Sequence, residues 1–250
     1  MRNPLGNPEY EAYLSQFENI FPAPEVAKKY LFDSIGRVTV VMNWLKEIQD
    51  GSIRKALELG SNPYNLTLLL KKYTSFELSL ANFFGESVEK GRHTQTVEGG
   101  GEKHEFTYDH FNLETDVYPY ADGFFDCVLF CEILEHLLLN PDFAVSEMRR
   151  ILRPGGYLII TTPNVLRLGN LVQMVKGKNI YDGYSQYGVY GRHNREYTLK
   201  EIIELLERNS FRIVRTEVRN IYPHPLKSRV LAGLRPNQWR EHLFVLGAKR

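Results

Sequence analysis

Cysteine is scarce in this chain. Its 250 residues include only two, Cys127 and Cys131, and both lie in one short apolar run. Two thiols on one predicted strand argue against the disulfide framework of a small secreted protein, so we expect a reducing, cytoplasmic location. No apolar run reaches the roughly 18 residues of a membrane helix, and the N-terminus lacks the basic-then-apolar pattern of a signal peptide. These absences favour a globular protein with no transmembrane segment.

Net charge is also almost absent, but the charges are unevenly placed. Residues 1–150 hold 14 Lys and Arg against 23 Asp and Glu, whereas residues 151–250 hold 17 against 7. An acidic half favours a cationic ligand, and a basic half favours an anionic one. Segregated solvent-facing charges explain the same pattern equally well.

The most informative stretch covers residues 124–163. An apolar run at Cys127–Cys131 predicts a buried parallel strand, and a helix follows at about Pro141–Leu152. Pro154, Gly155 and Gly156 then predict the end of that helix, before a second buried strand at Tyr157–Thr162. This order is a strand–helix–strand crossover, the unit of a doubly wound sheet.

The Phe-Asp strand followed by the Leu-Arg-Pro-Gly-Gly turn resembles the class I S-adenosylmethionine-dependent methyltransferases. The resemblance covers roughly residues 55–165 and implies an α/β fold. That fold is a doubly wound, seven-stranded, mostly parallel sheet, Rossmann-like, here with an N-terminal helical cap. We expect a single domain: a cap at 1–54, a cofactor-binding core at 55–165, and an acceptor lid with C-terminal strands at 166–250.

Within this domain the sequence predicts two helices in the cap, with a break near Gly36, and a first buried strand at Lys55–Leu59. The glycines of Glu98–Glu102 predict the turn of an extended hairpin. The last strands are expected at Arg212–Arg219 and Leu243–Lys249, so that the sheet has five parallel strands plus a terminal hairpin. A mobile aromatic lid is suggested by the tyrosines beside glycines, Tyr181, Tyr184, Tyr187 and Tyr190.

The stretch Ala56–Tyr64 stands where the family has its first motif, a strand-to-helix turn whose glycines let the cofactor approach the backbone. Gly60 matches the first glycine, and Asn62 can hold the turn because Asn tolerates a left-handed backbone. Tyr64 departs from the pattern. Taken alone, this motif is weak.

The next predicted strand is Ser75–Ser79, and the family's ribose-binding acid maps to Glu77 at its end. Asn112 and Glu114 are both candidates for the adenine, with Asn112 preferred. Together the resemblance implies contacts with S-adenosylmethionine, and with S-adenosylhomocysteine as product, from Glu58, Gly60, Ser61, Asn62, Glu77, Leu78, Asn112, Leu113, Cys131 and Glu132.

Glu132, Glu135 and His136 follow the predicted Cys127–Cys131 strand, on the usual ligand side of an α/β sheet. Their spacing resembles the ubiquinone-pathway O-methyltransferases, in which such residues bind a divalent cation. We favour the interpretation without a metal, in which His136 is the general base. His193 is the second candidate base, in a loop before the capping box formed by Thr198 and Glu201.

The predicted activity is therefore methyl transfer to oxygen on a small-molecule or glycan acceptor. An anionic acceptor or peripheral membrane contact would use the basic insertion, Arg219–Arg240. Two alternatives stay open: a nucleic-acid methyltransferase, disfavoured by the lack of an Asn/Asp-Pro-Pro-Tyr/Phe motif, and a non-catalytic cofactor-binding member. A NAD-dependent enzyme is disfavoured because no full Gly-x-Gly-x-x-Gly is present.

Overall fold

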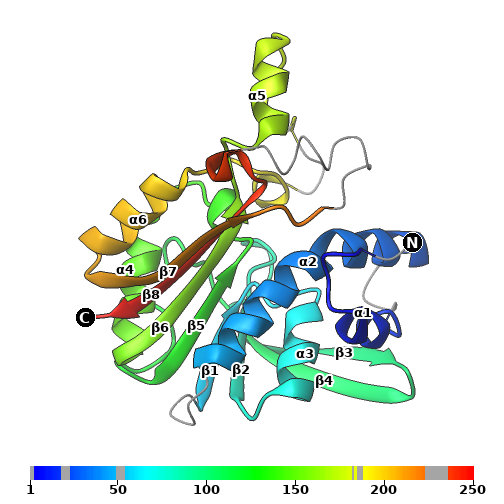
Figure 1. Cartoon of the computed structure of the whole chain (residues 1–250). Helices are drawn as coiled ribbons and strands as arrows, with labels where there is room; N and C mark the ends of the chain where they lie inside the picture. The colour runs from blue at the N-terminus through cyan, green and yellow to red at the C-terminus, as the bar shows by residue number, and fades with distance from the viewer. Residues whose placement is uncertain (1–2, 18–22, 49–53, 182, 185–187, 223–235) are drawn as a thin grey trace. The chain divides into compact units, whose positions relative to one another are not determined.

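The computed structural model describes residues 3–17, 23–48, 54–181, 183–184, 188–222 and 236–250 (Figure 1). The chain divides into two compact units. Unit 1 comprises Met1–Asn112 with Ile221–Pro223, and unit 2 comprises Leu113–Asn220 with His224–Arg250. The centre of the basic insertion, which includes Lys227 and Arg229, lies outside the described residues.

Unit 1 carries four strands in the order β3-β4-β2-β1, with β1, β2 and β4 parallel to one another and β3 antiparallel to β4. Helices α1, α2 and α3 pack against one another. The elements are α1 (Pro8–Leu14), α2 (Pro24–Ile48), β1 (Lys55–Leu59), α3 (Asn65–Tyr73), β2 (Glu77–Asn82), β3 (Gly91–Gly99) and β4 (Glu102–His110).

The helical cap is present as α1 and α2, but the break that we expected near Gly36 is wrong, because α2 continues through it. A Cβ on Gly36 would lie 2.7 Å from the carbonyl oxygen of Ile221, so this glycine allows a close backbone approach rather than ending the helix. The hairpin predicted around Gly99–Gly101 is confirmed as β3 and β4.

Unit 2 carries the other four strands in the order β5-β6-β8-β7. β5 and β6 are parallel, whereas β8 runs antiparallel to both β6 and β7. The elements are β5 (Phe125–Cys131), η1 (Leu134–His136), α4 (Asp142–Ile151), β6 (Leu152–Pro163), α5 (Leu168–Val175), η2 (Val189–Gly191), α6 (Leu199–Arg208), β7 (Phe211–Arg219), η3 (Asn237–Trp239) and β8 (His242–Lys249).

Apolar runs fill both cores, as expected for buried parallel strands. Leu57, Leu59 and Trp44 are at most 1% exposed in unit 1, and Phe130 and Ile160 are fully buried in unit 2. The described residues form eight strands rather than the predicted seven, a small difference within the same α/β fold class. Among the described helices, none combines the length and the apolar character that crossing a bilayer requires.

Candidate active site

The turn after β1 is built around Gly60, which has φ +65° and is exposed. This backbone conformation favours glycine, and the missing side chain leaves the backbone approachable by a ligand. The left-handed position that we expected at Asn62 is instead at Tyr64, with φ +68°. Glu58 is buried beneath this turn, and its carboxylate accepts a hydrogen bond from Thr67 Oγ1 at 2.6 Å.

Asn82, at the end of β2, holds this turn in place. Its Oδ1 accepts hydrogen bonds from Ser61 Oγ at 3.1 Å and from the Asn62 backbone N–H at 3.0 Å. Its Nδ2 donates to the Tyr64 hydroxyl at 3.2 Å. One amide therefore shapes three residues of the first motif.

Tyr64, which departs from the family pattern, packs against the hairpin of β3 and β4. It is 1% exposed, its hydroxyl donates to Gln95 Oε1 on β3 at 2.5 Å, and its ring stacks on Phe106 of β4 at 4.8 Å between centroids. The inserted hairpin therefore covers the tyrosine that replaces the expected small residue.

The position predicted for Glu77 and Leu78 is wrong. β2 begins at Glu77 rather than ending near it, and Glu77 is in register with Lys55, the first residue of β1. Glu77 is thus exposed at the amino end of parallel strands, whereas Gly60 follows their carboxyl end. Since ligands bind beyond the carboxyl ends of such strands, Glu77 is badly placed to bind ribose.

The two candidates for adenine binding have different partners. Asn112 Nδ2 donates to Glu86 Oε1 at 2.9 Å, in unit 1. Glu114 Oε1, in unit 2, accepts the backbone N–H groups of Leu138 and Leu139 at 2.7 and 2.5 Å. Glu114 thus orders a loop of its own unit, and the preference for Asn112, with the half-buried Leu113 next in sequence, stays a prediction.

In unit 2, β5 ends at the half-buried Cys131, and Glu132 follows with φ +58°. Such a conformation is uncommon and strained for a residue with a side chain. Glu132 Oε1 accepts hydrogen bonds from Thr161 Oγ1 at 2.7 Å and from His242 Nε2 at 2.6 Å. Neither partner was singled out from the sequence.

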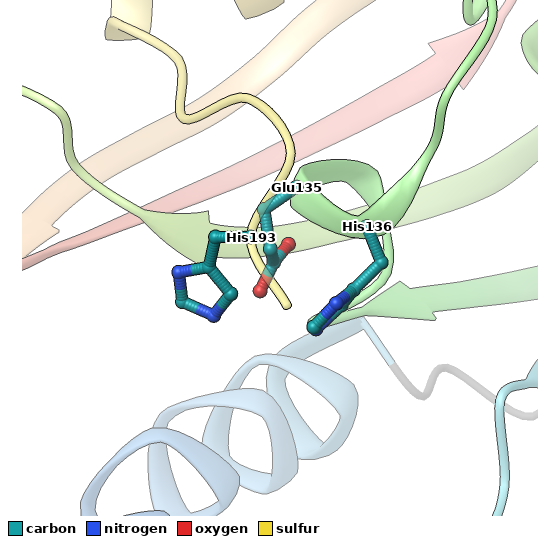
Figure 2. A group of neighbouring side chains, drawn as sticks. All are labelled: Glu135, His136 and His193. Atoms are coloured by element: carbon teal, nitrogen blue, oxygen red, sulfur yellow. The ribbon is translucent and has the colours of Figure 1, made fainter. Parts of the chain in front are cut away.

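Glu135, His136 and His193 lie together just beyond β5 (Figure 2). The ring centroids of the two histidines are 5.1 Å apart. Glu135 is 1% exposed, and its Oε2 accepts a hydrogen bond from Thr162 Oγ1 at 2.8 Å. Burial, together with the charge of Glu132, raises the pKa of Glu135.

The loop that carries His193 is bonded to η1. The backbone N–H groups of Asn194 and Arg195 both donate to the Glu135 carbonyl, at 2.8 and 3.2 Å, and Asn194 Nδ2 donates to the His136 carbonyl at 2.9 Å. The predicted capping box of Thr198 and Glu201 is confirmed at the start of α6.

Glu196 anchors the same loop from inside the unit. Burial alone would raise its pKa, but hydrogen bonds from His193, Arg167 and Asn170 lower it to about 2. Of the tyrosines expected in a lid, Tyr184 is 96% exposed and lies 4.6 Å, centroid to guanidinium, from Arg192, whereas Tyr187 lies outside the described residues.

Comparison with known proteins finds methyltransferases. A family model described as a methyltransferase domain matches residues 57–160. A ubiquinone/menaquinone biosynthesis C-methyltransferase of Hahella chejuensis is 31% identical over 97 residues, which are 37% of this chain and 37% of that protein. A probable S-adenosylmethionine-dependent methyltransferase of Mycolicibacterium smegmatis is 32% identical over 95 residues, 38% of this chain and 32% of that protein.

The chain thus spans about a third of the length of these two curated relatives. Among solved structures, an S-adenosylmethionine-dependent methyltransferase from Archaeoglobus fulgidus has a TM-score of 0.56 and 15% identity. The match covers 88% of this chain and 99% of that one, and it supports the fold. The matching domain and the two relatives support a class I S-adenosylmethionine-dependent methyltransferase.

Proposed function

We propose that the chain methylates a hydroxyl oxygen of a small-molecule or glycan acceptor, with S-adenosylmethionine as methyl donor. The observation that carries this proposal is the pair His136 and His193 beside the buried carboxylate of Glu135. A hydroxyl must lose its proton to attack, and imidazole is the side chain suited to accept one near neutral pH. The Hahella relative, by its name, methylates carbon, so carbon acceptors are the competing class.

The cofactor supplies a methyl group activated on a sulfonium, so the protein's task is mainly proximity and alignment. We assign its binding to the turn at Gly60, Ser61 and Asn62, with Asn112 for the adenine. The exposed, side-chain-free backbone at Gly60 fits such a ligand. Cys131 and Glu132 stay predicted contacts.

The proposed function is tested by incubating the full chain with S-adenosylmethionine and a panel of phenols, catechols, hexoses and uronic acids. We expect S-adenosylhomocysteine to form above the acceptor-free rate with at least one of these, and NMR to place the new methyl group on oxygen. Turnover of carbon acceptors alone would overturn the assignment to oxygen. Cofactor binding without turnover of any acceptor would instead favour a non-catalytic member.

Asn82→Ala is expected to weaken S-adenosylhomocysteine binding by about 1–3 kcal/mol, because it removes hydrogen bonds from three residues of the turn. Asn82→Asp keeps the Oδ1 acceptor for Ser61 and Asn62, so its affinity for S-adenosylhomocysteine should fall less than that of Asn82→Ala. The measurement is titration calorimetry, with thermal unfolding to confirm that each variant folds.

Glu77→Ala is the matched control, since it removes an exposed carboxylate from the opposite end of the same strand. Its affinity should equal that of the parent chain. If Glu77→Ala weakens S-adenosylhomocysteine binding as much as Asn82→Ala does, Glu77 binds the ribose after all.

A further inference from the structure

Glu135, His136 and His193 offer one carboxylate oxygen and two imidazole nitrogens that all lie within 4.8 Å of one another. Figure 2 shows the Glu135 carboxylate between the two rings. One carboxylate and two imidazoles with further positions open is the ligand set of many catalytic transition-metal sites. The cluster therefore has the chemistry of a metal centre.

The two oxygens of the Glu135 carboxylate differ in their hydrogen bonding. Its Oε2 accepts a hydrogen bond from Thr162, but its Oε1 is buried and finds no hydrogen-bond partner among the residues that the structure describes. A buried acceptor left unsatisfied is costly, and the cost is larger for an ionised group. A cation bound at Oε1 would satisfy this oxygen.

Both histidines are oriented as metal ligands usually are. His136 Nδ1 lies 2.8 Å from the Arg192 carbonyl oxygen, which can only accept, so Nδ1 carries the proton. His193 Nδ1 lies 3.0 Å from Glu196 Oε1. Such contacts through one ring nitrogen to a carbonyl or carboxylate fix the ring and make the other nitrogen, Nε2, the ligand.

We propose that Glu135, His136 and His193 bind a divalent first-row transition ion such as Zn²⁺ or Mn²⁺. Two imidazoles favour such an ion over Mg²⁺ or Ca²⁺, which prefer oxygen ligands. This set differs from the Glu132, Glu135 and His136 alternative of the sequence. Glu132 instead bonds to Thr161 and His242, and His193 takes its place.

The inference rests on the proposed function and changes how the histidines act in it. With the ion bound, they are ligands, and the ion's open positions take the acceptor oxygen. A bound divalent ion lowers the pKa of a coordinated hydroxyl, so the hydroxyl proton can pass to solvent water and no imidazole has to accept it. The oxygen would then take the methyl group as its bond to the sulfonium sulfur breaks, with S-adenosylhomocysteine as the leaving group. The hydrogen bonds from Asn194 and Arg195 to the Glu135 carbonyl hold the ligands together in advance.

The test is calorimetric titration of Zn²⁺ or Mn²⁺, and visible absorption on adding Co²⁺, with the untagged full chain stripped by chelator. One ion per chain is expected. Glu135→Gln, His136→Asn and His193→Asn should each weaken binding by more than the roughly 10–100-fold caused by losing an outer partner. Asparagine is chosen because its side-chain amide lies near the position of the histidine Nδ1, whereas it has no atom at the position of Nε2, the proposed ligand. Glu196→Gln changes the partner of His193 Nδ1 but removes no ligand atom, so its loss should fall in that 10–100-fold range, with thermal unfolding to confirm that the loop still folds without the Arg167 ion pair.

His93→Ala is the control, because His93 lies on β3 outside the cluster and its ring contacts the Glu89 carbonyl. It should bind the ion as the parent does. Absence of saturable binding, or equal losses of ion affinity in His93→Ala and His193→Asn, would overturn the metal site.

The metal site and the proposed function can fail separately. If the ion does not bind but His136→Asn still abolishes methyl transfer, the metal site fails and the proposed function stands. If the ion binds but no hydroxyl acceptor is methylated, the proposed function fails and the metal site stands.

Discussion

His136→Asn is expected to lower the single-turnover rate of methyl transfer by roughly 10²–10⁴-fold, the usual cost of losing a general base. The change removes Nε2 while leaving an amide nitrogen near the position of Nδ1. The hydrogen bond to the Arg192 carbonyl can therefore persist. A loss of rate then reports chemistry at Nε2 rather than a displaced loop.

The rate is measured with saturating cofactor, whose affinity is determined separately. The rate of His193→Asn should be lowered less than that of His136→Asn, and the rate of His93→Ala should equal that of the parent chain. Stripping divalent ions from the parent chain with a chelator should leave the rate unchanged if His136 accepts the proton, and should abolish it if His136 is a metal ligand. Wild-type rates in both site variants would mean that the acceptor needs no histidine and that proximity alone carries the reaction.

The fold was largely predictable because its strands carry continuous apolar runs. Lys55–Leu59 and the C-terminal strands were expected almost at their observed limits. Helix α5, Leu168–Val175, was not expected. Its apolar residues Leu168, Leu171, Val172 and Val175 do recur at helical spacing, which was the available signal. Only Asn170 is buried in it, so the apolar stripe of this helix is not packed into the core.

The end of β2 was misplaced because Ser75–Ser79 and Glu77–Asn82 read alike as short, partly apolar stretches. Periodicity alone does not fix such a boundary. Register decides it, since Leu59 pairs with Ala81 and the strand must reach Asn82 to meet the turn at Gly60. A polar Asn directly after Leu80 and Ala81 was the available signal.

His242 could have been found from topology. β8 runs antiparallel to β6, so the first residue of β8 lies opposite Pro163, at the carboxyl end of β6. A terminal hairpin was predicted, and its geometry places His242 on the side of Glu132. The grouping of His193 with Glu135 could not be foreseen, because it depends on hydrogen bonds between two loops.

Glu58→Gln is expected to stabilise the chain by about 3 kcal/mol at pH 7. Burial raises the pKa of Glu58 to about 8 from an ordinary 4.5, outweighing the hydrogen bond from Thr67, which lowers it. Between these two values the folded state holds a proton that the unfolded state has lost. Stability therefore falls as pH rises from 4.5 to 8, by about 1.4 kcal/mol for each unit of pH.

Glutamine is neutral and keeps an oxygen that can accept from Thr67 Oγ1, so the variant escapes this loss. Denaturant unfolding of both proteins should give similar stabilities near pH 4 and a gap that widens up to about pH 8. Glu105→Gln makes the same charge change on an exposed position of β4 and should show no widening gap. Because Glu135 is also buried, only the difference between parent and variant isolates Glu58. A constant difference across this pH range would mean that Glu58 is ionised inside the fold, with a partner other than Thr67.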